Sequence, residues 1–367
     1  MKNKYVEKDA AVTKGRIIGL DVFRILLAAL VLAFHSTIHF QCYYGILDSF
    51  ISMGAIAMTG FFMLSGFSLF YVHGDDDMHT FANVKGFYRK RLIGIMPSYY
   101  IVGLLYCFFC GNESPLQNLL LAPMEILGLQ SAYPSTFGLT HNGGTWFISC
   151  LLMCYALFPF MKECIGQMGA KSRFVLLVIL GGIMLYSPIV VWRFQLGSIY
   201  SNPFFRTNEF LIGMLLASCM KGIDRIGWLR KILYNRASVA AEAAVLVLGV
   251  SLAYGLGIGK GNYMLYSWIC LPLFSAIIIG LSGSGGVKHK QSRCGRILSY
   301  LSDICYAFFL VQLFIWPVMQ KMTDFVDIHN NVFKIVSSFI FCTAAAAVIH
   351  EMIEMPIKRC LHKMLKV

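Results

Sequence analysis

Ten stretches of about 20 mostly apolar residues follow one another along the 367-residue chain. An α-helix needs roughly 20 such residues to cross a bilayer, so each stretch predicts a spanning helix. Hydrophobic residues make up 57% of the chain and charged residues 13%, too apolar and too poorly charged for a soluble fold. The sequence therefore predicts an all-α membrane protein with ten helices, near 19–41, 50–72, 92–110, 144–162, 174–192, 203–220, 237–257, 264–282, 297–320 and 332–352.

Lysine and arginine are unevenly distributed between the two sides of this arrangement. With the N-terminus in the cytoplasm, the termini and connections on the cytoplasmic side hold 25 of the 31 Lys and Arg residues. Positive residues favour the cytoplasmic side of spanning helices, so both termini are predicted to be cytoplasmic. The net charge of +13 is then mainly an orientation signal. It does not indicate nucleic-acid binding, because no basic patch or recognition module stands out.

The chain is predicted to form one membrane domain, residues 17–356, between a leader (1–16) and a basic cytoplasmic tail (357–367). The first apolar stretch is about 23 residues long and has no small-residue cleavage site after it, so it is expected to be retained as a span. Of the twelve cysteines, only Cys42 and Cys110 lie at outer helix ends, where they could pair.

The first predicted helix carries the most informative polar side chains. Arg24 and His35 are eleven residues apart, which places them on one helix face about 16 Å apart along the axis. Asp21 and His39 lie near the same stripe. Ionisable groups inside a span are functional candidates, and a histidine can act as a general base near neutral pH. The alternative is structural: Arg24 reaches the inner headgroups and His35 hydrogen-bonds a neighbouring helix.

Several other chemistries lack their sequence signatures. His35 and His39 have the i, i+4 spacing of metal ligands, but there is no glutamate between them and no evident third ligand, so no metal site is predicted. The chain also lacks a phosphate-binding loop, a G-x-S-x-G elbow, an H-E-x-x-H motif and a dinucleotide fingerprint, so ATP-driven transport and zincin chemistry are unsupported.

Two further features each allow a functional and a structural interpretation. Arg89, Lys90 and Arg91 precede the third helix and suit a phosphate group, although a basic anchor at the inner surface is the simpler explanation. Trp146 begins the fourth helix, where it is either a residue of the aromatic belt or a stacking surface for a substrate.

The outer side of the predicted domain holds three more candidates. Arg206 and Glu209 are three residues apart on the sixth helix, where they form a structural i, i+3 pair or line an outer polar cavity. His141 lies in the longest outer connection, residues 111–143, which contains no Lys or Arg. Loops of that length are usually functional or disordered.

Taken in order, seven motifs over about residues 16–360 resemble the acyltransferase-3 family of membrane-bound acyltransferases, which modify cell-surface glycans and lipids. The first contains the family's arginine, ten residues and histidine, here Arg24 and His35. The motifs are RIIGLDVFRILLAALVLAFH (16–35), GFFMLSGFSLF (60–70), FYRKRLIGIMPSYY (87–100), TWFISCLLMCYALFPF (145–160), RTNEFLIGMLL (206–216), LSDICYAFFLVQ (301–312) and Glu354-Met355-Pro356.

The resemblance implies transfer of an acyl group, usually acetyl, from cytoplasmic acyl-coenzyme A to a hydroxyl of a surface polysaccharide or related glycan. It implies acyl-coenzyme A as a co-substrate, with no permanently bound cofactor, and a plasma-membrane location. His35 would deprotonate the acceptor hydroxyl or carry the acyl group transiently, and Arg24 would orient the donor or stabilise charge along its path. The remaining candidates are Arg89, Lys90 and Arg91 for the donor phosphates, and Trp146, His141, Arg206 and Glu209 for the acceptor.

The chain departs from the common family pattern at two positions. Gly94 stands where many members have a second arginine, three residues after Arg91. Cys150 stands where many have a glutamate, which resembles the subgroup that acts on exopolysaccharides. The fused outer hydrolase-like domain of some members is expected to be absent.

A transporter or permease is the main alternative, with the polar stripe of the first helix lining a translocation path. The Arg24–His35 pair and the lack of the internal repeat typical of transporters favour an enzyme. A non-catalytic membrane partner in polymer assembly is a third interpretation.

Overall fold

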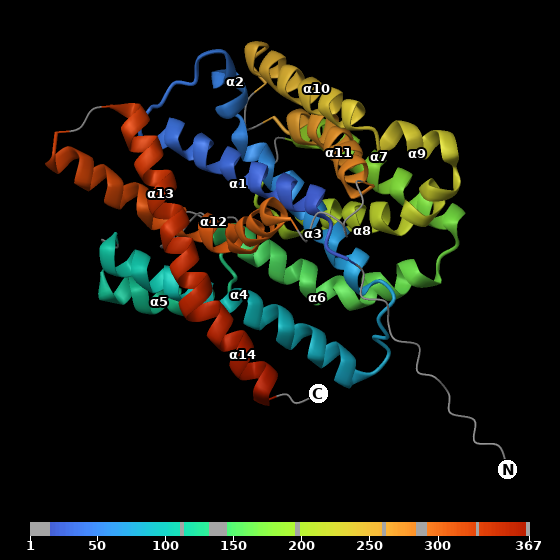
Figure 1. The fold of residues 1–367 in the computed structure, drawn as a ribbon, viewed down its shortest axis with the longest axis horizontal. Coiled ribbons are helices and arrows are strands. Elements are labelled where there is room, and N and C mark those ends of the chain that lie inside the picture. The colour runs from blue at the N-terminus through green and yellow to red at the C-terminus, as the bar shows by residue number, and fades with distance from the viewer. Residues whose placement is uncertain are drawn as a thin grey trace.

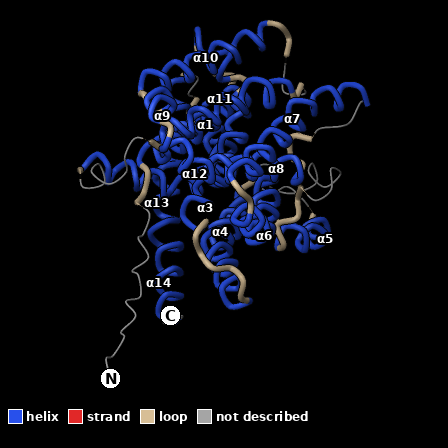
Figure 2. Tube along the Cα trace, turned by 90° about the vertical axis from the view of Figure 1, so that its right-hand side faces the viewer, coloured by secondary structure: helices blue, strands red, loops and turns tan. Residues whose placement is uncertain are grey.

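The computed structural model describes residues 15–110, 114–131, 145–194, 199–258, 262–283, 292–327 and 330–364. Within those ranges the chain is helical and contains no β-strand, as Figures 1 and 2 show. The predicted all-α class is therefore confirmed.

A helix occupies each of the ten predicted places. These helices are α1 (Ile18–His39), α3 (Ala57–His73), α4 (Phe81–Phe109), α6 (Trp146–Gln167), α7 (Ala170–Phe194), α8 (Pro203–Arg225), α10 (Arg236–Gly255), α11 (Leu271–Ser282) with the π-helical segment Leu265–Cys270 before it, α12 (Arg293–Phe325) and α13 (Asn331–Ile349). Shorter helices are α2 (Asp48–Ile51), α5 (Pro115–Ile126), α9 (Gly227–Leu233) and α14 (Met355–Met364), which continues α13 through a π-helical segment, His350–Glu354.

Nine helical segments of the described chain, not ten, are long and apolar enough to cross a membrane. The exception is α8, which is 23 residues long but carries Arg206 and Glu209 in its first two turns. These side chains lower its apolar character below that of the other helices. The helix nevertheless lies inside the protein, packed against α3, α6 and α7 (Figure 1).

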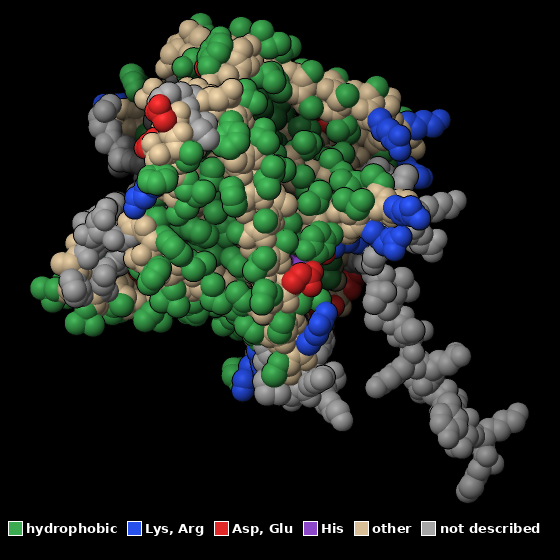
Figure 3. All heavy atoms as spheres, turned by 60° about the vertical axis from the view of Figure 1, so that its left-hand side comes forward, with side chains coloured by type: hydrophobic (Ala, Val, Ile, Leu, Met, Phe, Trp, Pro, Cys, Tyr) green, Lys and Arg blue, Asp and Glu red, His purple; other side chains and the backbone are tan. Residues whose placement is uncertain are grey.

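Apolar side chains dominate the outer surface of the helix bundle. Phe108, Leu104 and Phe160 are 83%, 70% and 70% exposed, although each belongs to a long helix. Figure 3 shows hydrophobic side chains covering a broad face, with charged side chains toward its edges. Such a surface suits a hydrocarbon environment, and together with the apolar helices it defines a multi-pass membrane protein.

Helices α3 and α8 approach each other at backbone distance because each has a glycine in the contact. A Cβ added at Gly66 would lie 1.9 Å from the carbonyl oxygen of Phe210, and one added at Gly213 would lie 2.0 Å from that of Met63. Small residues allow such close approach between membrane helices. The α3–α8 pair is therefore in direct backbone contact inside the molecule.

Helix α1 runs parallel to α12, and two contacts fix their register. The Nη1 atom of Arg24 donates to the Oγ atom of Ser302 at 2.7 Å. Nearer the other end, the His39 ring stacks on Trp316, with ring centroids 5.7 Å apart and planes inclined by 12°. Fifteen residues separate the two contacts on α1 and fourteen on α12. Residues between them can therefore be matched level by level, at about 1.5 Å per residue.

Candidate functional site

A cavity of ≈ 490 Å³ lies among α1, α3, α4, α6, α12 and α14. It extends along α12 from Ser302 to Phe309 and along α3 from Val72 to Met58. Four basic side chains line it, namely Arg24, Lys90, Arg91 and Lys358. The earlier turns of α3, the first turn of α6 and the middle of α12 contribute apolar groups instead: Met58, Phe61, Phe62, Phe147 and Phe309. The cavity thus combines a cluster of positive charges with an apolar interior.

Arg24 is held in place by a polar network between α1 and α12. Besides its bond to Ser302, it makes a longer contact of 3.5 Å with Asp21. Asp21 accepts a stronger hydrogen bond, 2.6 Å, from the Nε atom of Arg16, which also binds Asp303 at 2.8 Å. Arg16 and Arg24 thus share the carboxylate of Asp21, and this network, which includes Asp303, holds the guanidinium of Arg24 where it lines the cavity.

Arg91 is positioned by a histidine at the end of α3. Its Nη2 atom lies 2.5 Å from the Nε2 atom of His73, whose Nδ1 atom lies 2.6 Å from a carboxylate oxygen of Asp76. Since arginine can only donate, His73 accepts at Nε2 and carries its proton on Nδ1, which donates to Asp76. Arg91 itself lines the cavity, and its buried Nε atom has no hydrogen-bond partner among the described residues.

Lys358 was missed by the sequence analysis, which placed it in a basic tail. In the structure α14 brings it to the cavity, and its Nζ atom lies 3.4 Å from Glu354. Glu354 is buried and also interacts with Ser98 at 2.7 Å and with His350 at 2.9 Å. The i, i+4 spacing of Glu354 and Lys358 was the available signal, since such pairs face each other on a helix.

The other residues of the basic stretch differ in position. Lys90 and Arg91 line the cavity, whereas Arg89 is exposed and is not among its lining residues. Gly94, one of the two departures from the family pattern, also lines the cavity, and a Cβ added there would meet nothing within 4 Å. The missing arginine side chain thus leaves space in the cavity. The second departure, Cys150, is fully buried elsewhere.

Arg206 and Glu209 form a completely buried ion pair of 2.8 Å, with both side chains 0% exposed. Thr59 donates to Glu209 at 2.9 Å, and the Nε atom of Arg206 donates to the carbonyl oxygen of Tyr200 at 2.7 Å. Five aromatic rings surround the guanidinium, with centroids 4.6–5.8 Å away: Phe62, Trp146, Tyr200, Phe205 and Tyr266. Burial also raises the pKa of Tyr200. This geometry favours the structural interpretation of the pair.

Trp146 belongs to the same cluster and is only 6% exposed, so it does not lie in an aromatic belt facing lipid. Its ring centroid lies 4.8 Å from that of Tyr200. It does not line the cavity that contains Arg24. His141, the remaining acceptor candidate, lies outside the described residues.

His35 does not line the cavity and lies beyond its apolar end, which Phe309 marks on α12. It is half-buried, its Nδ1 atom is buried, and its ring centroid lies 5.5 Å from Phe34 and 6.1 Å from His39. The register between α1 and α12 places it level with the helical turn that follows Phe309. Arg24 and His35 thus share a helix face, but only Arg24 lines the cavity.

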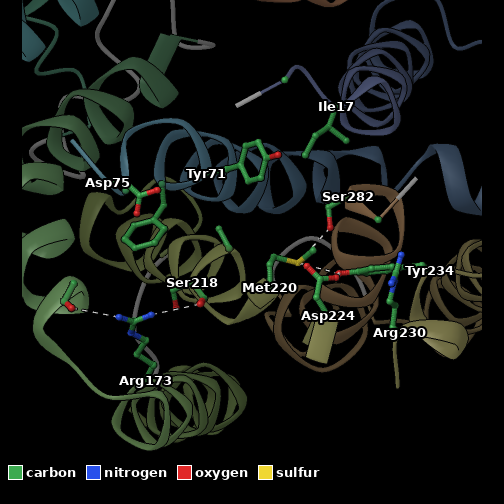
Figure 4. A pocket seen from close by; sticks show the side chains of 16 residues that line it. Ile17, Tyr71, Asp75, Arg173, Ser218, Met220, Asp224, Arg230, Tyr234 and Ser282 are labelled. Carbon is green, nitrogen blue, oxygen red and sulfur yellow. Dashed lines mark hydrogen bonds between the residues drawn. The ribbon is translucent and has the colours of Figure 1, made fainter. Parts of the chain in front are cut away.

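A second cavity, of ≈ 510 Å³, contains none of the predicted site residues. Figure 4 shows its polar groups bonded to one another: Arg173 donates to backbone carbonyls, Tyr234 donates to Asp224 at 2.9 Å, and Ser282 lies 3.4 Å from the sulfur of Met220. We therefore regard the cavity lined by Arg24 as the functional candidate.

The cysteines and the other potential metal ligands form no further centre. All twelve cysteines are free thiols, including Cys42 and Cys110. In the part of the chain that the structure describes, no group of three or more His, Cys, Asp or Glu side chains is placed to hold a metal ion.

These features define a multi-pass membrane protein with a basic and apolar cavity inside its helix bundle. The chain matches the acyltransferase domain model of the acyltransferase-3 family over residues 17–351. Because this match covers nearly the whole chain, the protein belongs to that family and is a membrane acyltransferase. The chain matches no curated protein and no solved structure.

Proposed function

We propose that this protein transfers an acetyl group from cytoplasmic acetyl-coenzyme A to a hydroxyl of a surface polysaccharide or related glycan at the plasma membrane. One observation carries the proposal: four basic side chains line a cavity whose apolar part leads along α12 toward the level of His35.

The cavity suits the two chemically different parts of coenzyme A. Its phosphates match the guanidinium and ammonium groups of Arg24, Lys90, Arg91 and Lys358, which bind phosphate oxygens by charge-assisted hydrogen bonds. The flexible arm that ends in the thioester would extend past Phe147 and Phe309. From Arg24 to His35 the helix rises about 16 Å, a distance that a long arm is suited to cover.

His35 would act as the general base in the transfer. The acceptor hydroxyl oxygen attacks the thioester carbonyl carbon and forms the new C–O bond, while His35 takes the hydroxyl proton. The tetrahedral intermediate then collapses, the C–S bond breaks, and the departing thiolate takes the proton back from His35. The histidine is thus regenerated, and the products are an O-acetyl ester and free coenzyme A.

The proposal is tested by the acetyl content of the surface glycan in cells with and without the gene. We expect O-acetyl groups to be lost on deletion and restored by the wild-type gene. Membranes of the deletion strain, supplied with radiolabelled acetyl-coenzyme A, should label the glycan only when they contain the protein. An unchanged acetyl content together with no labelling would refute the proposal.

Binding of coenzyme A distinguishes an acyltransferase from a transporter. At 100 times its Kd, a ligand specific for the folded state stabilises a protein by about 2.7 kcal/mol. We therefore expect coenzyme A to raise the Tm of the detergent-purified protein, and adenosine to raise it much less. A Tm insensitive to coenzyme A would contradict a donor site in the cavity.

Lys358 provides a specific test of the basic lining. Replacing it with alanine removes one charged phosphate contact, worth roughly 1.5–3 kcal/mol. We expect Lys358→Ala to raise the KM for acetyl-coenzyme A about tenfold or more and to leave kcat nearly unchanged, because the residue lies far from the acetyl group. Lys171→Ala removes an exposed lysine away from the cavity and should leave both constants unchanged. Equal effects of the two variants would argue against a role of Lys358 in donor binding.

A further inference from the structure

Gln312 on α12 has a fully buried side chain whose amide is unsatisfied. The residue is 0% exposed, and neither its Nε2 nor its Oε1 atom has a hydrogen-bond partner among the described residues. An unsatisfied buried polar group costs about 1–3 kcal/mol, so a native fold rarely keeps one without a reason. An amide that only joined helices would bond a neighbouring helix, and this one does not.

The helix register places Gln312 opposite the proposed catalytic base. His35 precedes His39 by four residues, and Gln312 precedes Trp316 by four residues. Residues at i and i+4 share a helix face, and the rings of His39 and Trp316 are stacked on each other. His35 and Gln312 each lie one helical turn before this stacked pair, and α1 and α12 are parallel. The two residues are therefore at the same level on facing sides of the two helices.

The cavity leads to the same place. Its innermost lining residue on α12 is Phe309, one helical turn before Gln312. On the far side, the indole Nε1 atom of Trp316 is also buried without a hydrogen-bond partner in the described structure. A short polar strip with unused hydrogen-bond donors thus begins where the apolar part of the cavity ends.

We propose that Gln312 is a catalytic residue whose Nε2–H group donates to the carbonyl oxygen of the acyl group. This inference rests on the proposed function. When the acceptor oxygen adds to the thioester carbon, the C=O π electrons move onto that oxygen, which becomes negatively charged. A pre-placed donor in a water-poor site stabilises this charge until the electron pair re-forms the carbonyl. The C–S bond then breaks, and the departing thiolate takes the hydroxyl proton back from His35. Removal of one such donor typically costs 10²–10³-fold in kcat.

The test variant is Gln312→Met, which keeps a side chain of similar length but removes both polar atoms. We expect kcat to fall about 10²–10³-fold, with little change in the KM for either substrate. The Tm should stay the same or rise, because an unsatisfied amide is removed from the interior. The assay measures transfer of radiolabelled acetyl groups from acetyl-coenzyme A to deacetylated surface polysaccharide, in membranes of the deletion strain that contain each variant.

Two further variants make the result specific. Gln320→Met is the matched control on the same helix, since Gln320 is bonded to Asp324 at 2.7 Å near the helix end and should not affect kcat. Gln312→Asn keeps the amide but withdraws it by one methylene, and a misplacement of about 1 Å at a reacting centre can cost about 10²-fold. The kcat of Gln312→Asn should therefore also fall. This second variant contains no methionine, so its result does not depend on how methionine packs at this position.

Each contrary outcome overturns the inference. An unchanged kcat in Gln312→Met and Gln312→Asn excludes the catalytic role. A fall in Tm that accompanies the loss of activity indicates a structural role, and a raised acceptor KM at unchanged kcat indicates acceptor binding. If the wild-type protein itself transfers no acetyl group, the proposed function fails, which the same assay shows separately.

Discussion

Replacement of His35 by alanine is expected to abolish transfer of the acyl group to the acceptor. Without a base at this position, the acceptor hydroxyl must attack while still protonated, and general-base catalysis typically contributes 10²–10⁴-fold. Because the side chain is half-buried, the helix bundle should still form. The measurement is the O-acetyl content of the surface glycan in cells that produce His35→Ala, compared with cells that produce the wild-type protein at equal membrane abundance.

His39→Phe is the matched control for this experiment. His39 lies one turn from His35, and phenylalanine preserves an aromatic ring to stack on Trp316. If His35 is the base and His39 takes no part in the reaction, His39→Phe should keep most of the wild-type activity. Equal loss in both variants would instead suggest a paired metal site, and unchanged acylation in His35→Ala would remove the proposed mechanism altogether.

Removal of Glu209 is expected to destabilise the protein strongly. The carboxylate is 0% exposed and bonds both Arg206 and Thr59. Glu209→Ala would leave the guanidinium of Arg206 as an uncompensated buried charge, and breaking a buried pair in this way costs about 3–5 kcal/mol. We expect a clear fall in Tm and a loss of protein from the membrane, measured by thermal unfolding in detergent.

Two comparisons distinguish this structural role from acceptor binding. Glu351→Ala removes an exposed glutamate and should change stability by less than about 1 kcal/mol. Replacing both Arg206 and Glu209 with methionine removes the two charges together, so much of the stability should return. If Glu209→Ala instead retains the wild-type Tm and raises the KM for the acceptor, the pair belongs to the acceptor site.

The positions of the helices could be predicted well because a spanning helix needs a long apolar segment, and each such segment is visible in the sequence. The number of spans was less secure, because α8 combines a central position with a buried ion pair. Arg206 and Glu209 satisfy each other inside the bundle, so α8 needs less apolar surface than a helix that faces lipid.

The composition of the site was harder to predict because it depends on tertiary packing. Lys358 reaches the same cavity as Arg24 only because α14 packs beside α4. No local sequence pattern predicts that these two helices are neighbours. The same holds for His73, which positions Arg91 from another helix. Gln312 became informative only when the structure showed its amide to be buried and unsatisfied.

The glycine contact between α3 and α8 makes one wall of the cavity rigid. Helix α3 forms one wall of the cavity, and α8 lies directly behind that wall at Gly66 and Gly213, so the wall cannot recede. Helix α4, which also lines the cavity, has only five buried residues among its 29 and is held less firmly. We therefore expect the α3 wall to keep its shape when the donor binds, and any widening of the cavity to involve α4. The shape of the cavity on that side is then a property of two glycines that do not themselves line it.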